Sequence, residues 1–574
     1  MATVLGFSEA SSDSSACIIR DGKILAAIDE ERVRREKHCG GFPELAINEV
    51  LRISRIKPSE IDRVAIGYKE ILPPLYAKQS ILNQRRVTLN PIENWKDRVG
   101  IGIFEKYYGW SHSSNVLKKI NYSITQGWIK SALGKIGINS SISRYDHHAC
   151  HAATAAFSSG WEKCLVITAD GRGDGISSTV NIFENNELKR ISESGVESSL
   201  GNFFGALTEA IGFKYGDGEG KAEALAAFGK ETKAYQILKE FIKIEGLKVK
   251  GKLNPHYRNI SVLFYELLKE FRKEDSAYAA QRILDESVTE IVKNAINETG
   301  INKVAFAGGI FYNVKTNQQI YEMPEVQDIY IYPASGDSGV SIGAAMLDIH
   351  QHEGMKIQRI EHVYYGASYT NDHIKSILEK RNLNYEYIND IGQYVGSELL
   401  PKDLLIGWFS GRMEFGPRAL GARSVLISPK KVENKKKVLS TIKKRPEFQP
   451  FCPSVQHEFM NDYVINPKNT DVPFMILALT GTEKMVKECP STTFIDKSIR
   501  VQDVKKEIHP EFHSLISSFG KVGGTPVLLN TSFNKSGQAI VHTPEQALYD
   551  LENSGLDYLV LENYLVWKKD HLHQ

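Results

Sequence analysis

The sequence lacks the features of secreted, membrane-spanning and zinc-ribbon proteins. Its 574 residues include six cysteines, which are scattered along the chain without a C-x-x-C pair. This pattern argues against a zinc ribbon and a disulfide framework, and it fits a reducing compartment. The amino-terminal segment MATVLGFSEASSD has no basic region followed by an apolar stretch, and no run of about 18 apolar residues occurs. We therefore expect a cytoplasmic protein that does not span a membrane.

An excess of charge of one sign is also missing. The 71 basic residues are balanced by 69 acidic ones, so the formal net charge is only +2. The chain therefore lacks the overall positive field that drives non-specific binding to nucleic acid. We expect no nucleic-acid partner, and any site for an anion must be built from a few local cations.

The length predicts more than one domain, because single hydrophobic cores stop growing at about 250 to 300 residues. Hydrophobic residues make up 42% of the chain and charged residues 24%, as in ordinary globular proteins. Apolar periodicity is lost between Gln351 and Asp372. We therefore predict a boundary near residue 357, which separates a domain of residues 1–357 from a domain of residues 358–574.

Hydrophobic patterning predicts a mixed α/β fold. Apolar runs at Thr3–Phe7 and Ala16–Ile19 precede the turn pair Asp21-Gly22 and a further run at Lys23–Ile28, which is typical of a hairpin. Later strands lead through glycines into helices, which indicates crossover units. The predicted helices are 43–56, 201–211 and 277–296, and the further predicted strands are 63–68, 163–168, 304–306 and 329–331.

A candidate metal site begins with His147 and His151 in the segment YDHHACHAATAAF. Their i, i+4 spacing puts both imidazoles on one face of an alanine-rich helix. Such a pair is more often two histidines on a helix surface or in a core than two ligands, so both interpretations stay open. Further ligands are available at Asp170 and Asp337, each near the end of a predicted strand. Two imidazoles and two carboxylates suit Fe(II), Mn(II) or Zn(II).

Two glycine-containing segments are candidate nucleotide sites. In VAFAGGIFYN, Gly308 and Gly309 lie at a strand-to-helix turn with Asn313 beyond them, and the missing side chains let backbone N–H groups approach a phosphate. A plain tight turn explains such a pair equally well. In GDGEGKAEALAAFG, Lys221 begins a predicted helix, where it could meet an anion.

The carboxyl-terminal part concentrates cations. GRMEFGPRALGARS contains three arginines among glycines, and guanidinium groups match the geometry of phosphate oxygens. Cations and polar residues that could join them follow later in the chain. They are Lys443, Lys444, Arg445, Arg500 and the polar run Asn530-Thr531-Ser532-Phe533-Asn534. Chance clustering, with each cation paired to a nearby acid, explains the pattern as well as an anion site does.

The order of the motifs resembles a known family. DEERVRREKH, HHACHA, ADGRGDG, AGGIFYN, SGDSGVSIGAA, EFGPRALGARS, PFCPSV and LNTSFN follow one another over nearly the whole chain. Together they are similar to the carbamoyltransferases of the NodU and tobramycin carbamoyltransferase type. The combination of GPRALGARS with LNTSFN is the most specific part of this resemblance.

The resemblance implies an actin-like two-lobed domain over residues 1–357, similar to the tRNA threonylcarbamoyl transferase, and a YrdC-like α/β domain over residues 358–574. In such proteins the second domain converts carbamoyl phosphate and ATP to carbamoyl-adenylate, and the first passes the carbamoyl group to a hydroxyl group of a small molecule, a natural product or a sugar. The resemblance also implies ATP with Mg and a divalent metal, foremost Fe(II). We expect a monomer or a homodimer.

The resemblance assigns roles residue by residue. Metal ligation falls on His147, His151, Asp170 and Asp337, and nucleotide binding falls on Gly308, Gly309 and Asn313, beside Lys221. Carbamoyl phosphate binding falls on Arg418, Lys443, Arg500 and Ser532, with Asn530 in the same motif. Lys37 matches a lysine near the transfer site.

Two positions depart from the family pattern. Relatives commonly carry a histidine after the first strand, where this chain has Ser12 followed by Asp13. If that histidine accepts the proton of the acceptor, then Asp13, the metal or a more reactive acceptor must take its place. Gln449 stands where relatives often have arginine, which predicts a weaker hold on phosphate.

Two other functions remain as alternatives, and a third is disfavoured by the sequence. A small-molecule kinase with the same actin-like fold would release ADP, whereas adenylation releases pyrophosphate. A hydrogenase-maturation carbamoyltransferase would carry an acylphosphatase domain and paired C-x-x-C sites, and the sequence has neither. A non-catalytic nucleotide-binding assembly protein would lack a stoichiometric metal ion.

Overall fold

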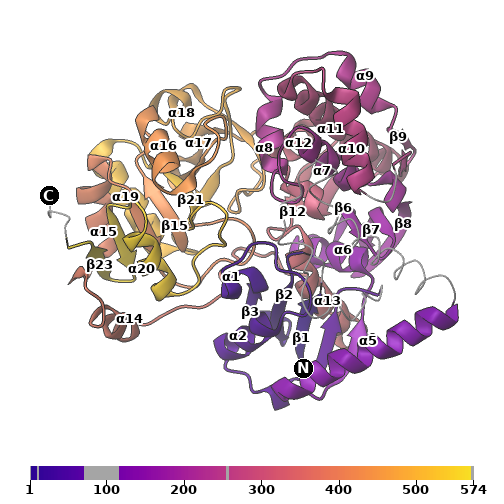
Figure 1. The fold of residues 1–574 in the computed structure, drawn as a ribbon, viewed down its shortest axis with the longest axis horizontal. Helices are drawn as coiled ribbons and strands as arrows, with labels where there is room; N and C mark the ends of the chain where they lie inside the picture. The colour runs from indigo at the N-terminus through magenta and orange to yellow at the C-terminus, as the bar shows by residue number, and fades with distance from the viewer. Residues whose placement is uncertain (1, 10–11, 70–114, 254–256, 570–574) are drawn as a thin grey trace. The chain divides into compact units, whose positions relative to one another are not determined.

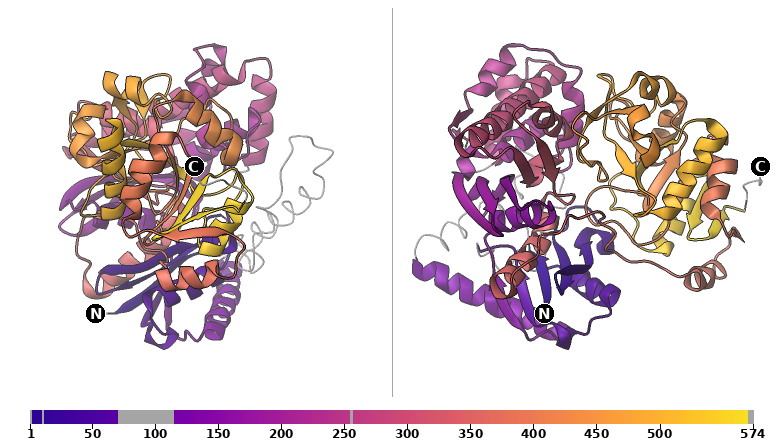
Figure 2. Two further views of the ribbon diagram at one scale, coloured as in Figure 1. Left: turned by 90° about the vertical axis from the view of Figure 1, so that its left-hand side faces the viewer. Right: turned by 180° about the vertical axis from the view of Figure 1, so that it is seen from behind.

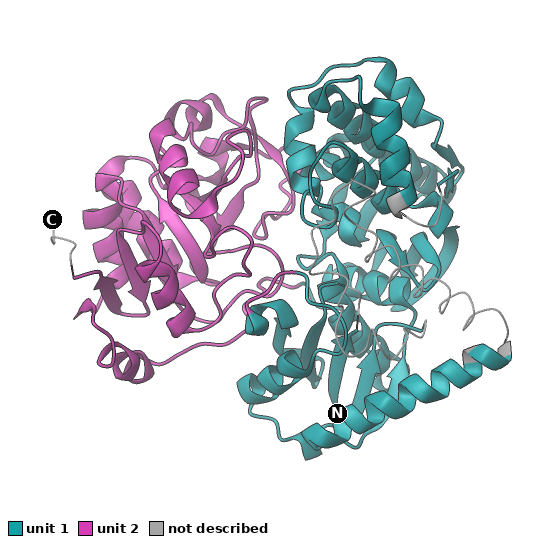
Figure 3. Ribbon diagram, in the orientation of Figure 1, with its two compact units in different colours: residues 1–34, 38–359 teal, residues 35–37, 360–574 magenta. Residues whose placement is uncertain are grey.

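The computed structural model describes residues 2–9, 12–69, 115–253 and 257–569. They form two compact units, shown in teal and magenta in Figure 3. The first unit contains residues 1–34 and 38–359, and the second contains residues 35–37 and 360–574. Arg35–Lys37 therefore belong by their contacts to the second unit, although they are surrounded in sequence by the first. None of the helices formed by the described residues is long and apolar enough to cross a bilayer.

The first sheet of unit 1 contains the predicted hairpin. Strands β2 and β3 are joined by Asp21 and Gly22, whose φ angles of 56° and 73° are those of a type I′ turn. Strand β1 pairs antiparallel with β2 and parallel with β4. The order is β3-β2-β1-β4-β5, with β1 at Thr3–Ser8, β2 at Ser15–Arg20, β3 at Lys23–Asp29, β4 at Arg63–Ile66 and β5 at Ser141–Arg144.

The second sheet of unit 1 has the order β12-β11-β6-β7-β8 (Figure 1). Strand β11 is parallel to both β6 and β12, so the predicted crossover connections are confirmed. The strands are β6 at Lys163–Gly173, β7 at Ile176–Glu184, β8 at Glu187–Gly195, β11 at Lys303–Ala307 and β12 at Asp328–Ile331; a separate hairpin joins β9 at Ile242–Glu245 to β10 at Lys248–Gly251.

The helices of unit 1 include the three that were predicted. Their observed counterparts are α2 at Glu44–Ser54, α7 at Leu200–Ala210 and α11 at Lys273–Thr299. The other α-helices within the described residues of this unit are α1 at Glu30–Arg34, α5 at Asn115–Ile136, α6 at His147–Ser158, α8 at Glu219–Ala226, α9 at Lys233–Lys239, α10 at Tyr257–Leu268, α12 at Val314–Glu322 and α13 at Asp337–Glu353.

Close backbone packing brings the starts of α6 and α13 together. Helix α13 lies beside β1 and β2 and against α6, and the rear view of Figure 2 shows the salmon helix next to the indigo strands. A Cβ atom on Gly343 of α13 would lie 2.0 Å from the carbonyl oxygen of Cys150 in α6. Glycine at this position therefore allows the two helices to touch, which places His147 and Asp337, the first residues of the two helices, near each other.

Unit 2 is built on an eight-stranded sheet with a core on each face. Neighbouring residues of β14 enter different cores, since Trp408 packs with Leu528 and Phe409 packs with Leu529. The order is β13-β23-β22-β14-β15-β21-β16-β20. The strands are β13 at Asn384–Tyr387, β14 at Ile406–Phe409, β15 at Arg423–Ile427, β16 at Cys452–Gln456, β20 at Gln502–Val504, β21 at Val527–Ser532, β22 at Tyr558–Leu561 and β23 at Tyr564–Trp567.

A smaller sheet and seven helices complete the described part of unit 2. The sheet contains β17 at Val464–Ile465, β18 at Leu479–Gly481 and β19 at Ser498–Ile499. The helices are α14 at Asn371–Leu378, α15 at Ile391–Tyr394, α16 at Val432–Val438, α17 at Met460–Tyr463, α18 at Glu483–Glu488, α19 at Pro510–Gly523 and α20 at Pro544–Glu552. The protein is thus mixed α/β, as predicted; the assignment of the two parts as actin-like and YrdC-like stays a prediction.

Candidate metal centre and anion site

Helix α6 carries both histidines of the candidate metal centre. Asp146 caps the helix, because its Oδ1 atom accepts a hydrogen bond of 2.7 Å from the backbone N–H of Ala149. The helix therefore begins at His147 and presents His151 one turn later. Both imidazoles are fully buried, which excludes the interpretation of the pair as surface histidines.

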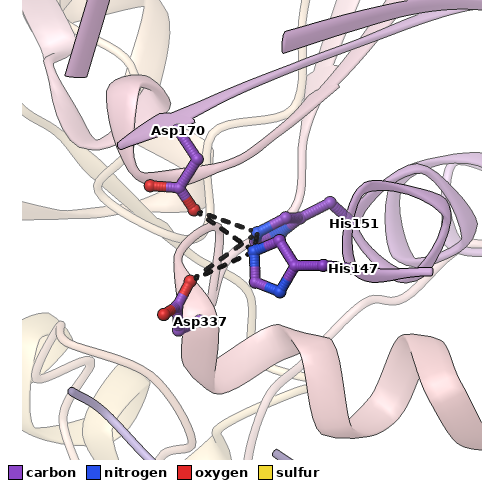
Figure 4. Close-up of side chains that lie close together, drawn as sticks. All are labelled: His147, His151, Asp170 and Asp337. Carbon is purple, nitrogen blue, oxygen red and sulfur yellow. Dashed lines mark hydrogen bonds and ion pairs between the residues drawn. The ribbon is translucent and has the colours of Figure 1, made fainter. Parts of the chain in front are cut away.

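The two imidazoles meet two carboxylates in the interior of unit 1 (Figure 4). The Nε2 atoms of His147 and His151 are 3.0 Å apart. Asp170, near the end of strand β6, lies with its Oδ2 atom 3.1 Å from His151 Nε2 and 3.7 Å from His147 Nε2. The Oδ1 atom of Asp337 is 3.5 Å from His147 Nε2 and 3.8 Å from His151 Nε2.

The two aspartates give this buried cluster an affinity for positive charge. Burial disfavours the charged form of His147, yet hydrogen bonding to Asp170 and the nearby Asp337 raise its pKa to about 9. Burial and the neighbouring Asp170 raise the pKa of Asp337 well above its usual range. Burial also raises the pKa of Asp170, but hydrogen bonds from both histidines outweigh it and hold this pKa well below the usual range. The carboxylates thus stabilise a cation between them and the imidazoles.

The residues present fit a divalent metal. One ligand atom from each of the four side chains lies within 4.8 Å of the other three. The Nδ1 atoms of His147 and His151 are buried and have no hydrogen-bond partner among the described residues. Both Nε2 atoms point inward beside carboxylate oxygens, and two nitrogen with two oxygen donors suit Fe(II), Mn(II) or Zn(II).

His148 has a different role from its two neighbours. Its Nδ1 atom lies 2.8 Å from the hydroxyl of Thr168 and its Nε2 atom 3.1 Å from the carbonyl oxygen of Ile176. Burial and the neighbouring His147 and His151 lower the pKa of His148 to about 3. It is therefore a neutral core histidine that fixes α6 to β6 and β7.

Three residues around the centre were not found from the sequence. A Cβ atom on Gly173 would lie 1.9 Å from Cδ2 of His147. The ring of Tyr68 is 4.3 Å from that of His147, and its hydroxyl donates to Asp337 over 3.4 Å. Asp174 accepts a hydrogen bond of 2.7 Å from the backbone N–H of His147. Gly173 and Asp174 are part of the DGRGDG motif, whose second half could have indicated a contact with the histidine helix.

Gly173→Ala is expected to displace the His147 imidazole, because the added methyl group would occupy the position of the ring. We expect a fall of at least about tenfold in the affinity for a divalent metal and loss of stoichiometric bound metal. Metal content is measured on the purified protein by elemental analysis. Gly127→Ala in α5, where a Cβ atom meets nothing within 4 Å, is the control. Retention of the metal by Gly173→Ala would contradict the assignment of His147.

The predicted nucleotide loop lies next to the metal candidate. Gly308 has a φ angle of 108°, and a Cβ atom there would lie 2.2 Å from the carbonyl oxygen of Ala169. A Cβ atom on Gly309 would lie 3.0 Å from Oδ1 of Asp170. Position 308 therefore requires glycine because of the close approach of β6, whereas a side chain at position 309 would press on the Asp170 carboxylate. Lys221 lies in the first turn of α8 and is half-buried.

Asn313 uses its side chain within the protein. Its Oδ1 atom accepts from the backbone N–H of Thr316 and from the amide of Gln281, and its Nδ2 atom donates to Gln281 over 2.8 Å. Asn313 thereby caps α12. The residue holds the loop in place rather than offering a free polar group.

Asp13 of the predicted transfer site is paired with a histidine. Its Oδ1 atom is 3.0 Å from Nδ1 of His38, whose Nε2 atom is 3.4 Å from Oδ1 of Asp217. Burial opposes protonation of His38, but Asp13 and Asp217 raise its pKa to about 10. His38 is thus a fixed cation that orients Asp13. Ser12 is half-buried beside Asp13 in sequence.

Lys37 belongs to unit 2, in a short segment held by Arg35. The Arg35 guanidinium forms an ion pair of 2.5 Å with Asp550, which is fully buried, and donates a hydrogen bond of 2.8 Å to the carbonyl oxygen of Ala539. Lys37 lies close enough to Lys443 to influence its pKa. Residues 35–37 therefore add two cations to the carboxyl-terminal unit.

Lys443 is a buried lysine whose amino group is held by neutral oxygens. Its Nζ atom donates to Ser532 Oγ over 2.9 Å and to Asn534 Oδ1 over 2.8 Å. Burial, Arg445 and Lys37 hold its pKa well below the usual range, and Asp550, which acts in the opposite direction, is already paired with Arg35. The LNTSFN motif thus positions Lys443 within a group of cations.

Arg500 and Asn530 join this group through β16. The Arg500 guanidinium donates to Cys452 Sγ from Nε over 3.0 Å and from Nη2 over 2.9 Å. Cys452 pairs in register with Asn530 of β21, whose Nδ2 atom donates to Ser454 over 3.0 Å. Arg445 lies with its guanidinium carbon 4.2 Å above the Phe451 ring.

The arginines of GRMEFGPRALGARS separate into different roles. Arg423 is fully buried and donates to the carbonyl oxygens of Gly411, Ala422 and Ala367, and Arg412 donates to those of Gly366 and Tyr365. These two cations hold the loop together. Arg418 is half-buried, and the residue after it, Ala419, accepts a hydrogen bond from Asn530.

Two family models cover most of the chain. The model described as carbamoyltransferase N-terminus matches residues 3–346, and the model described as carbamoyltransferase C-terminus matches residues 397–568. The first contains all four residues of the candidate metal centre. The second contains Lys443, Arg500 and the LNTSFN motif.

Similar proteins occur in archaea and bacteria. An uncharacterized protein of Methanocaldococcus jannaschii is 30% identical over 99% of this chain and 100% of its own length. The nodulation protein NolNO of Sinorhizobium fredii is 27% identical over 97% of this chain and 79% of its own. A 3'-hydroxymethylcephem-O-carbamoyltransferase of Amycolatopsis lactamdurans is 25% identical over 60% of this chain and 63% of its own.

Proposed function

We propose that this chain, which belongs to the carbamoyltransferase family, is an ATP-dependent O-carbamoyltransferase that carries a carbamoyl group from carbamoyl phosphate to a hydroxyl group of a small molecule. The observation that carries the proposal is the buried Lys443, which is surrounded by Arg445 and Lys37 and bonded only to neutral oxygens among the described residues. Such a cation is costly to bury unless an anion binds beside it.

The reaction that we propose proceeds through carbamoyl-adenylate. Carbamoyl phosphate and water give carbamate and phosphate, and the carbamate oxygen then attacks the α-phosphate of ATP and displaces pyrophosphate. Carbamate alone lacks a good leaving group, whereas the mixed anhydride with AMP has one. We assign the binding of the phosphate-bearing substrates to Lys443 and Arg500, supported by their position in the carboxyl-terminal family match, together with Arg418, Asn530 and Ser532.

We assign transfer to the amino-terminal unit. A divalent metal held by His147, His151, Asp170 and Asp337 would supply positive charge that offsets the charge on a leaving phosphate. The Asp13 carboxylate, oriented by the His38 cation, accepts the proton of the attacking hydroxyl. The hydroxyl oxygen forms a bond to the carbamoyl carbon, and the bond from that carbon to the oxygen of AMP breaks. Ser12 cannot act as a base at neutral pH and lies beside this proton acceptor.

The acceptor is a hydroxyl-bearing small molecule in this proposal. Support comes from the relative whose name specifies O-carbamoyl transfer to a 3'-hydroxymethylcephem. The glycines Gly308 and Gly309 and the half-buried Lys221 are assigned to the nucleotide, because tight turns at strand ends bring backbone N–H groups close to phosphates.

The purified full-length chain, supplied with Mg-ATP and carbamoyl phosphate, is expected to release pyrophosphate in a manner that depends on carbamoyl phosphate. With an acceptor, AMP follows as the second product. Both products are measured by coupled assay and chromatography. Release of ADP and transfer of phosphate to an acceptor would instead indicate a kinase. If the chain binds ATP but releases neither AMP nor ADP, it is a nucleotide-binding assembly protein.

A further inference from the structure

Cys452 occupies an unusual position among the cations of unit 2. It is the first residue of β16, its side chain is buried, and its Sγ atom accepts hydrogen bonds from Arg500 Nε over 3.0 Å and from Arg500 Nη2 over 2.9 Å. The two nitrogens of the guanidinium fork thus converge on one sulfur atom. A neutral thiol sulfur is a weak acceptor, whereas this fork geometry matches two oxygens of a carboxylate or phosphate.

A second arginine lies beside the same sulfur. Cys452 and Arg500 both influence the charge of Arg445, whose pKa is lowered to about 10 by burial, with Cys452 opposing and Arg500 adding to the effect. The Nε atom of Arg445 is buried and has no hydrogen-bond partner among the described residues. Neither Arg445 nor Arg500 forms an ion pair with a carboxylate of any residue that the structure describes.

Asn530 provides an independent indication that a ligand binds here. It pairs in register with Cys452 across β21 and β16, so the two side chains lie on one face of the sheet. Asn530 is 1% exposed, and its Oδ1 atom has no hydrogen-bond partner within the described residues, although its Nδ2 atom is bonded to Ser454. A ligand that carries both phosphate oxygens and an N–H or O–H donor would supply acceptors for the two arginines and a donor for Asn530 Oδ1.

We propose that Cys452 is a positioning residue whose sulfur holds the Arg500 fork where a phosphate-class anion binds, and that the anion replaces the sulfur as the acceptor. This inference rests on the proposed function, because carbamoyl phosphate is the anion concerned. Replacement of the sulfur by the anion is favourable because charged phosphate oxygens are stronger hydrogen-bond acceptors for a guanidinium than sulfur is. When no anion is bound, the sulfur keeps Arg500 from turning toward other acceptors.

The first test replaces the sulfur with a permanent anion. In the full-length protein, Cys452→Asp places a carboxylate between Arg500 and Arg445, and Cys452→Asn is the uncharged control of nearly equal size. We expect Cys452→Asp to unfold at a higher temperature than Cys452→Asn and to lose the stabilisation that inorganic phosphate gives the wild type. Pyrophosphate release from carbamoyl phosphate should fall by at least about 100-fold. Phosphate stabilisation of Cys452→Asp equal to that of the wild type would overturn the inference.

The second test removes the acceptor without adding charge. Cys452→Ala is expected to raise the KM for carbamoyl phosphate about five- to tenfold, with kcat and the KM for ATP close to wild type, because only the orientation of Arg500 is lost. Cys452→Ser should restore most of the KM, since its hydroxyl also accepts. Cys489→Ala, at another buried cysteine, is the control for loss of a thiol. A fall in kcat at unchanged KM would assign Cys452 a merely structural role and overturn the inference.

The outcomes separate this inference from the proposed function. If the wild type releases pyrophosphate and binds phosphate while Cys452→Asp and Cys452→Ala do the same, the inference alone is wrong. If the wild type neither releases pyrophosphate nor responds to phosphate, the proposed function fails and the inference falls with it. Should Cys452→Asp not fold, the KM values of the alanine and serine variants still decide.

Discussion

His147→Ala and Asp337→Ala are each expected to remove the bound divalent metal and to lower carbamoyl transfer by at least about 100-fold, while pyrophosphate release stays close to wild type. Each substitution removes one of four donors that converge within 4.8 Å in the interior of unit 1. In His147→Ala the two carboxylates would then face one another with less positive charge between them, and in Asp337→Ala one of the two anionic donors is lost. Pyrophosphate formation is spared because we assign it to residues of unit 2.

Metal content is measured by elemental analysis, and transfer is measured in a single turnover from preformed carbamoyl-adenylate. His352→Ala, an exposed histidine near the end of α13, is the control for removing an imidazole from the same unit. Proportional loss of both steps in His147→Ala would refute the division of the reaction between the two units. A full complement of metal in the variant would refute the ligand assignment itself.

Lys443→Met is expected to have the opposite effect, with pyrophosphate release reduced roughly 100-fold, or about 3 kcal/mol for a charged contact to phosphate, and transfer from preformed carbamoyl-adenylate largely retained. Methionine keeps most of the length of the lysine side chain but removes its charge. The Nζ atom that binds Ser532 and Asn534 is lost, so the cation nearest to the LNTSFN motif disappears.

The control for Lys443→Met is Lys436→Ala, because Lys436 is an exposed lysine of α16 in the same basic segment. Thermal unfolding of both variants shows whether the loss of activity follows from loss of structure, since Ser532 and Asn534 keep each other as partners over 2.6 Å. Unchanged pyrophosphate release in folded Lys443→Met would exclude the lysine from the anion site. A loss confined to the transfer step would move its role to the other half of the reaction.

Local patterns determined most of the elements that carry the candidate sites. The Asp21-Gly22 turn and the alanine-rich helix of the histidines follow from interactions between residues close in sequence. The alternation of strands and helices around β11 predicted the crossovers, although the strand pairing itself joins distant segments. A boundary between separate hydrophobic patterns near residue 357 has the same local origin.

The binding partners of the basic side chains could not be predicted from local patterns. The sequence presents Arg412, Arg423 and Lys443 as similar members of basic segments, yet the two arginines bind backbone carbonyl oxygens and Lys443 binds the LNTSFN motif. Which acceptor a cation meets depends on strands that are far apart in the chain, such as β15 and β21, which pair antiparallel. The placement of Arg35–Lys37 in unit 2 likewise depends on the distant Asp550.

The sequence by itself determined the α/β class, the order of the motifs, the family and the four candidate residues of the metal centre, because each of these depends on short segments that can be recognised without the distant parts of the chain. Only the tertiary structure decided that His147 and Asp337 meet. Gly343 permits the contact of α6 with α13, which brings together residues 190 positions apart. It also decided that the Cys452 sulfur faces Arg500, because that contact requires β16 and the segment after β19 to lie side by side.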